Sequence, residues 1–143
     1  MRIARFLRLP GHDRVLLAQA ALFLVAIRLC LWVVPFSRVQ RLVERFAEPS
    51  SRTSHAIVDA RRIAWAVDAA ARSVLIDNCL ARAVTAQVLL RRFGYEGDIR
   101  IGVAREPGGG FVAHAWVESD GHVLIGDDEL ERYQTTSGPG RIA

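Results

Sequence analysis

The hydrophobic period of the chain changes once, at Gly94. Before this glycine, apolar residues recur at the spacing of helices, as in residues 57–75 and in the stretch that begins at Cys79. After it, apolar and polar residues alternate as in strands, in residues 97–105, 111–118 and 122–126. Helices followed by strands that are joined through short turns predict an α+β domain with an antiparallel sheet.

Charge divides the chain into a basic front part and a mildly acidic remainder. All 19 basic residues are arginine; residues 1–62 carry 11 of them against four acidic residues, whereas residues 63–143 carry eight against 11. A basic surface is complementary to acidic lipid, nucleic acid or an acidic peptide, and charge alone does not choose among them. The loop at residues 47–55 is rich in Pro and Ser. We therefore divide the chain into an N-terminal helical region, residues 1–50, and a core domain, residues 51–143.

Residues 15–36 form the most apolar segment. A bilayer span needs about 20 clean apolar residues, but Arg28 interrupts this run and Pro35 ends it. Arginine at the centre of a bilayer is costly, and we see no small-residue cleavage site of a signal peptide. We expect buried or surface-lying helices here, and a peripheral membrane contact through residues 15–36 stays open. The next stretch is amphipathic, with an apolar side made of Val39, Leu42, Val43 and Phe46.

The two cysteines occupy different contexts, and they do not indicate a disulfide framework. Cys30 lies in the apolar run, and Cys79 follows the helix-capping residues Asp77 and Asn78. The helix dipole stabilises a thiolate at such a position. Cys79 is therefore either a small buried hydrophobe or a reactive thiolate. We expect both thiols to be reduced, as in the cytoplasm. Periodicity assigns Cys79, Ala83, Ala86, Leu90 and Phe93 to the apolar face of this helix, and Arg82, Thr85 and Arg92 to another face.

His114 lies in the middle of the predicted strand 111–118, on the face that it shares with Trp116 and Glu118. A lone histidine in an apolar strand is usually structural. A histidine beside a helix-start cysteine is what nucleophilic catalysis needs, because the imidazole takes the thiol proton and the imidazolium keeps the sulfur ionised. We therefore predict Cys79 as the nucleophile and His114 as the base.

A third group usually orients such a base, and counting along the last hairpin provides a candidate. A two-residue turn at residues 120–121 gives the opposed pairs Ser119 and His122, Glu118 and Val123, Trp116 and Ile125, and His114 and Asp127. Opposed side chains have Cβ atoms about 4.5–5.5 Å apart, so we predict Asp127 as the orienting residue. A three-residue turn would place Gly126 opposite His114 instead, and Asp128 stays open as an alternative.

No motif predicts a cofactor or a metal site. The glycine triplet in residues 106–110 is best explained as a hairpin turn, because no helix follows it as in a phosphate-binding loop. We expect no cofactor, no metal and no nucleic-acid partner.

Three stretches together carry a resemblance to a known family: CLARAVTAQVLLRRFGY, IRIGVAREPGGGFVAHAWVESDGHVLIG and ELERY, between residues 79 and 133. They resemble the transglutaminase-like leader peptidases of lasso-peptide biosynthesis, the stand-alone protease halves of a split maturation protein. The family's nucleophile and base correspond to Cys79 and His114. Many relatives carry Asn-Asp after the second strand, where this chain has Ile-Gly-Asp-Asp. The resemblance implies a transglutaminase- or papain-like core in which the nucleophile helix packs on an antiparallel sheet.

The resemblance also implies a reaction and partners. A cysteine peptidase of this kind removes the leader from a ribosomally made precursor peptide through an acyl-enzyme. A separate protein recognises the leader, and an ATP-dependent cyclase downstream closes the macrolactam. Nothing in this chain resembles a nucleotide site. Two other interpretations stay open: a transglutaminase-like acyl transferase, and a non-catalytic scaffold that binds a membrane or a partner.

Overall fold

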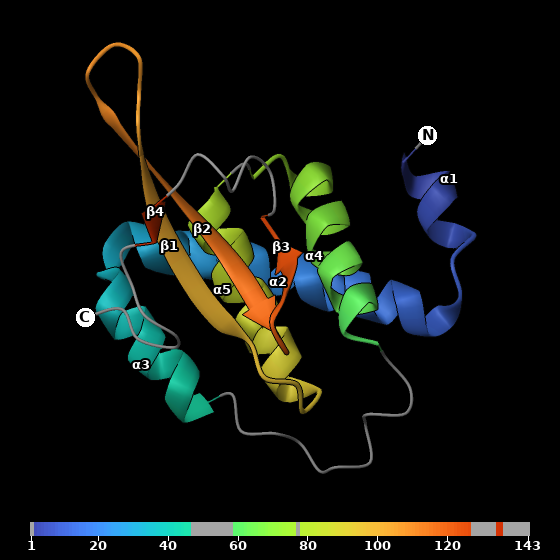
Figure 1. Cartoon of the computed structure of the whole chain (residues 1–143). Coiled ribbons are helices and arrows are strands. Elements are labelled where there is room, and N and C mark those ends of the chain that lie inside the picture. Colours follow the sequence, from blue (N-terminus) through green and yellow to red (C-terminus); the bar gives the residue numbers. More distant parts are fainter. Residues whose placement is uncertain (1, 47–58, 77, 127–133, 136–143) are drawn as a thin grey trace.

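The computed structural model describes residues 2–46, 59–76, 78–126 and 134–135 of the 143-residue chain. The helices come first and the strands after them, which confirms the predicted α+β class (Figure 1). The elements are α1 (Arg2–Leu7), α2 (Gly11–Val33), α3 (Phe36–Phe46), α4 (Ala60–Val74), α5 (Cys79–Arg92), β1 (Asp98–Arg105), β2 (Phe111–Ser119), β3 (His122–Ile125) and β4 (Gln134–Thr135).

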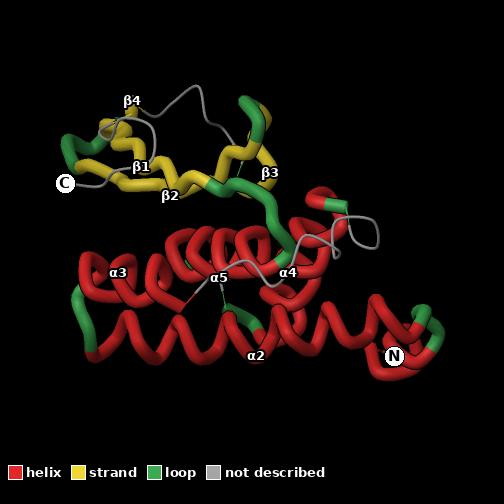
Figure 2. The backbone as a smooth tube through the Cα atoms, turned by 90° about the horizontal axis from the view of Figure 1, so that it is seen from below, coloured by secondary structure: helices red, strands yellow, loops and turns green. Residues whose placement is uncertain are grey.

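The elements form layers, with the sheet on one side and α2 on the other (Figure 2). The sheet is antiparallel with the strand order β3-β2-β1-β4. Helix α5 contacts the strands on one side and both α2 and α4 on the other. Helix α5, which begins with the predicted nucleophile Cys79, is therefore the centre of the molecule and packs on the sheet as expected.

The central position of α5 corrects the predicted division of this helix into an apolar and a polar face. Thr85, expected on the polar face, is fully buried, and its hydroxyl donates to the carbonyl of Ala81 at 2.7 Å. Gln87 is buried too, and its amide nitrogen donates to the carbonyl of Gly97 at 3.0 Å. Periodicity missed this because a helix that is covered on both sides needs no solvent-facing stripe.

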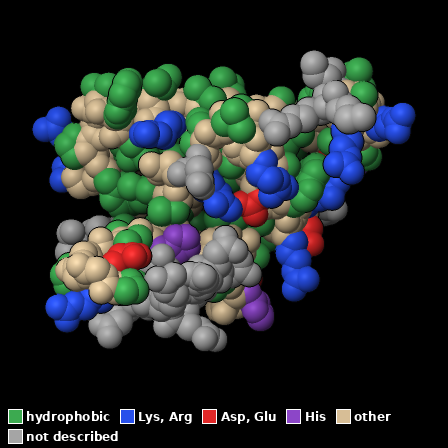
Figure 3. Space-filling model, turned by 90° about the horizontal axis from the view of Figure 1, so that it is seen from above, with side chains coloured by type: hydrophobic (Ala, Val, Ile, Leu, Met, Phe, Trp, Pro, Cys, Tyr) green, Lys and Arg blue, Asp and Glu red, His purple; other side chains and the backbone are tan. Residues whose placement is uncertain are grey.

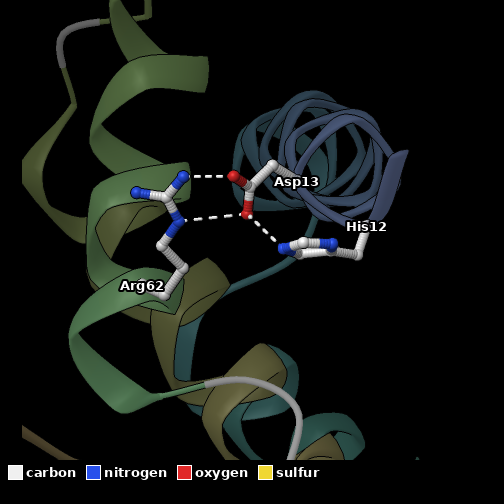
Figure 4. A network of polar contacts seen from close by, with 3 residues as sticks. All are labelled: His12, Asp13 and Arg62. Carbon is white, nitrogen blue, oxygen red and sulfur yellow. Dashed lines mark hydrogen bonds and ion pairs between the residues drawn. The ribbon is translucent and has the colours of Figure 1, made fainter. Parts of the chain in front are cut away.

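An ion pair between a buried carboxylate and a solvent-exposed arginine joins the beginnings of α2 and α4 (Figure 4). Asp13 is 1% exposed and pairs with Arg62, whose Nε donates to the carboxylate at 3.0 Å. His12 lies 3.5 Å from the same carboxylate, and the Arg62 guanidinium stacks 4.2 Å from the centre of the Trp65 ring. The hydrogen bonds from Arg62 hold the pKa of Asp13 below its ordinary value, and those to Asp13 raise the pKa of Arg62.

The last hairpin confirms the predicted turn but corrects the predicted register. Asp120 and Gly121 form the turn with φ values of 50° and 76°, and the pairs nearest to it are as predicted. Ile125, however, pairs with Val117 and not with Trp116. Leu124 is the extra residue of a β-bulge, which shifts every later pair by one position. The alternation of residues along the sequence could not predict this bulge.

The N-terminal helices partly resolve the alternatives for residues 15–36. Helix α2 buries one face against α4 and α5 and exposes the other, so it is both a packed and a surface helix. In α3, Val39 and Val43 are buried and therefore do not belong to an exposed apolar surface, whereas Leu42 is 47% exposed. The proposed domain boundary at residue 50 lies outside the described residues and stays a prediction.

Candidate active site

Cys79 is the first residue of α5, as predicted. The side chain of Asn78 caps the helix by accepting from the backbone N–H of Ala81 at 2.9 Å. The thiol is half-buried against the core. The first N–H groups of a helix have no partner within the helix, so this position combines a thiol with the positive end of a helix dipole. Asp77, the other predicted cap, lies outside the described residues.

His114 lies on β2, opposite Gly102 of β1. Its ring stacks near Trp116 with a centroid distance of 6.2 Å. The Trp116 indole in turn donates to Glu118 at 3.0 Å, and Arg100 donates to the other oxygen of that carboxylate at 3.2 Å. The predicted face with His114, Trp116 and Glu118 is therefore present, as a row of polar contacts beginning at the imidazole.

The hydrogen bond of the His114 imidazole to Gly126 assigns its tautomer. The Nε2 atom lies 2.7 Å from the carbonyl oxygen of Gly126. A carbonyl oxygen only accepts, so Nε2 carries the hydrogen and donates it. In the neutral ring, Nδ1 is then the nitrogen with the lone pair. Nδ1 is the atom that can take a proton from a thiol.

The two predicted catalytic residues lie on neighbouring elements, since α5 contacts β2. Ala115 and Val117 of β2 belong to the core that α5 shares. Because side chains alternate along a strand, His114 lies on the other face of β2. The hydrogen bond shown for the imidazole is the one to the carbonyl of Gly126. The structure thus brings the two elements together.

The third predicted residue, Asp127, lies outside the described residues, as does its alternative Asp128. The bulge at Leu124 changes the count on which the preference for Asp127 rested. Both residues therefore stay candidates for the orienting role.

Sequence reasoning missed an ion pair that ties the start of α5 to α4. Arg82 lies one turn after Cys79 and pairs with Asp68 of α4. Both side chains are partly buried, with 20% and 30% of their surfaces exposed. Asp68 also lines a depression of about 530 Å³ between α4 and β3, together with Trp65 and His122. The spacing of Arg82 from Cys79 was visible in the sequence, but its partner on another helix was not.

Within the described part of the chain, no group of three or more His, Cys, Asp or Glu side chains is arranged to hold a metal ion. The chemistry that the described side chains support is that of a thiol, an imidazole and backbone N–H donors.

Comparison with known proteins provides a family. Residues 21–137 match the transglutaminase-like superfamily, a range that begins within α2 and includes α5 and all four strands of the sheet. No curated protein and no solved structure matches the chain. The match includes both Cys79 and His114, and it indicates chemistry of the cysteine-peptidase or acyl-transferase type. Because this match covers most of the length of the chain, the chain belongs to the transglutaminase-like superfamily.

Proposed function

We propose that the protein is a cysteine peptidase that removes the leader from a lasso-peptide precursor through an acyl-enzyme. The observation that carries this proposal is the position of Cys79, the first residue of a capped central helix in a transglutaminase-like chain. The sequence resemblance of residues 79–133 supports the choice of substrate. Because the precursor is made on the ribosome, the cytoplasm is the expected place of the reaction.

The proposed reaction is an acyl transfer to water. The Cys79 thiolate attacks the scissile carbonyl, a C–S bond forms, and the oxyanion accepts a hydrogen bond from the backbone N–H of Cys79. The C–N bond then breaks, and His114 gives the proton that it took from the thiol to the departing amine of the core peptide. Water hydrolyses the thioester, which releases the leader as a carboxylate and restores the thiol.

The proposal requires that His114 and Cys79 meet during turnover. Their elements are in contact, and catalytic hydrogen bonds often tighten only when substrate is bound. The bond from Nε2 to Gly126 supports the role of base, because it directs the lone pair to Nδ1. Because His114 lies on the face of β2 away from the core that α5 shares, we expect β2 or the start of α5 to move in the complex with the precursor, so that the imidazole reaches the thiol.

We assign the orienting role to one carboxylate, that of Asp127 or that of Asp128. In the complex with the precursor it takes the place of the Gly126 carbonyl as acceptor of the Nε2 hydrogen, because Nδ1 serves as the base. Replacement of the residue in this role by Asn should lower the turnover of the enzyme about 10⁴-fold, because an amide favours the wrong imidazole tautomer. The other Asn variant should remain close to wild type. Cleavage rates of Asp127→Asn and Asp128→Asn decide between them, and two nearly unchanged rates would contradict a carboxylate in this role.

Leader recognition is assigned to a separate protein. The described residues before α4 form helices, and a helix does not capture an extended leader by strand addition as a sheet edge does. A recognition protein that tethers the leader raises the effective concentration of the scissile bond. The free amine that cleavage releases is the group that an ATP-dependent cyclase consumes when it closes the macrolactam.

The test is mass spectrometry of a candidate precursor, encoded beside this gene, after incubation with the protein. The expected products are the free leader and the core peptide, formed faster in the presence of the recognition protein at low precursor concentration, and absent with Cys79→Ala. An added primary amine distinguishes the alternative, because an acyl transferase would join the leader to that amine. An intact precursor in every mixture would overturn the proposed function.

A further inference from the structure

Helix α2 has two apolar faces, and one of them is open to solvent. Leu24 and Ala20 represent the inner face and are fully buried. The outer face consists of Val15, Leu22, Leu29 and Val33, with exposed fractions of 59%, 69%, 56% and 84%. At about 100° per residue, these four side chains fall within about 40° of one another around the helix axis. Together with the exposed Ala18, Val25 and Ala26 between them, they form an apolar stripe from Val15 to Val33.

We propose that this stripe, which we call the outer face of α2, docks on the surface of an anionic lipid bilayer with the helix axis parallel to the membrane plane. Exposed apolar side chains are ordinary when scattered, but a contiguous row marks a surface with a partner. In the part of the chain that the structure describes, α2 is the outermost layer, opposite the sheet (Figure 2).

The packing of the inner face makes a transmembrane orientation incompatible with this fold. By length and composition α2 could cross a membrane. Its inner face, however, packs against α4 and α5, and Asp13 at its beginning pairs with Arg62 of α4. A span would draw α4, with its exposed Arg61, into the hydrocarbon, which is costly. A helix that lies in the interface buries its outer face in lipid and keeps this packing.

Charge identifies the kind of membrane. Arg14 and Arg28 follow one border of the outer face, about 80° and 120° from Leu22 on the helical wheel. The long side chain of Arg28 can extend toward headgroups while its stem covers apolar surface. Further arginines lie on the neighbouring helices α1 and α3 and in the turn after α1, namely Arg5, Arg8, Arg38, Arg41 and Arg45. Hydrophobic side chains line the edge of the molecule that α2 forms, with arginines near them (Figure 3).

The same arginines decide against a second copy of the chain as the occupant, because a symmetric contact would bring like charges together. Trp32, 80% exposed, stands at the end of the outer face, and an indole is suited to the boundary between headgroups and acyl chains. A bilayer contact on α2 leaves the sheet side open (Figure 2), so a peptide can still reach the elements that carry Cys79 and His114.

The experiment is co-flotation of the full chain with vesicles. Vesicles that contain phosphatidylglycerol and phosphatidylcholine are compared with vesicles of phosphatidylcholine alone. We expect flotation with the anionic vesicles, weaker binding as salt rises, and release by alkaline carbonate, which leaves a spanning helix in place. A fluorophore on Cys30, the one thiol left in Cys79→Ala, should report an apolar environment on the vesicles. Absence of binding to the anionic vesicles, or resistance to carbonate, would overturn the proposal.

Matched variants locate the contact. Leu22→Glu and Leu29→Glu should each lower binding about tenfold or more, and Arg28→Gln should lower it about fivefold. Phe111→Glu introduces the same charge at a site of equal exposure, 72%, on the opposite layer, and should bind as wild type does. Circular dichroism verifies that each variant folds. Equal vesicle binding by Leu22→Glu and Phe111→Glu would overturn the proposal. Dimerisation through the outer face of α2 in the absence of vesicles, or binding of the leader-recognition protein to this face, would also overturn it.

Discussion

Helices α2 and α5 are both rich in apolar residues, but the fold uses them in opposite ways. Helix α5 is enclosed, with a buried run from Ala83 to Leu90 that includes the polar Thr85 and Gln87. Helix α2 is longer, yet much of its apolar surface faces solvent. Each helix also carries one of the two cysteines: Cys79 at the capped start of α5 and Cys30 exposed on α2.

The difference shows that position in the fold, and not apolar composition, assigns each helix its role. A helix held on all sides keeps its first residue in a fixed place, which a nucleophile needs. A helix with one open face can contact something else without losing its packing. The following predictions test this contrast, beginning with the largest expected effect.

The two cysteines should differ most in activity. Cys79→Ala should abolish precursor cleavage, a loss of roughly 10⁶-fold in turnover, while the protein stays folded. Cys30→Ala should cleave at nearly the wild-type rate, because its side chain lies on the exposed surface of α2. Cleavage rates by mass spectrometry and circular dichroism of both variants provide the comparison. An equal loss of cleavage activity in the two variants would contradict the assignment of Cys79 of α5 as the nucleophile.

Truncation of one leucine on each helix should separate their contributions to stability. Leu89→Ala removes a fully buried side chain from α5 and should lower the free energy of unfolding by about 2–5 kcal/mol. Leu22→Ala, on the outer face of α2, should change it by no more than about 0.5 kcal/mol. Urea unfolding of both variants measures the difference. A similar loss of unfolding free energy in both variants would mean that the outer face of α2 is covered in solution.

The ion pair of Asp13 with Arg62 should make the anchoring of α2 depend on pH. The pKa of Asp13 lies below its ordinary value in the folded chain. Its contribution to stability is therefore present above about pH 4 and is lost as the pH falls through the folded pKa. Asp13→Asn should have a lower Tm than wild type at neutral pH, and the gap should narrow in acid. A gap that stays constant down to strongly acidic pH would contradict this role.

Much of the fold was predictable from local pattern. The change of period at Gly94 predicted the order of helices and strands, and the capping residue Asn78 predicted the start of α5. The two-residue turn at residues 120–121 followed from its Asp-Gly pair, since both positions adopt positive φ. These features are encoded by residues that lie close together in the sequence.

Features that depend on distant residues were not predictable. The burial of Thr85 results from two layers that close over α5, and the bulge at Leu124 breaks the alternation on which the choice of Asp127 rested. The sequence also suggests Cys79 and His114 as a pair, but alternation along β2 places the histidine on the face away from the shared core. A strand pattern identifies which residues share a face, and only packing decides which face meets the helix.

The central claim is that Cys79 is an activated nucleophile with His114 as its base. The most direct measurement is the rate of iodoacetamide alkylation of each cysteine over a range of pH, resolved by peptide mass spectrometry, in wild type and in His114→Ala. Exposure alone would make Cys30 react faster, because Cys79 is half-buried. Our account predicts that Cys79 reacts faster than Cys30 near neutral pH and that His114→Ala abolishes this advantage. A Cys79 that reacts more slowly than Cys30, or whose rate is the same in His114→Ala, would contradict it.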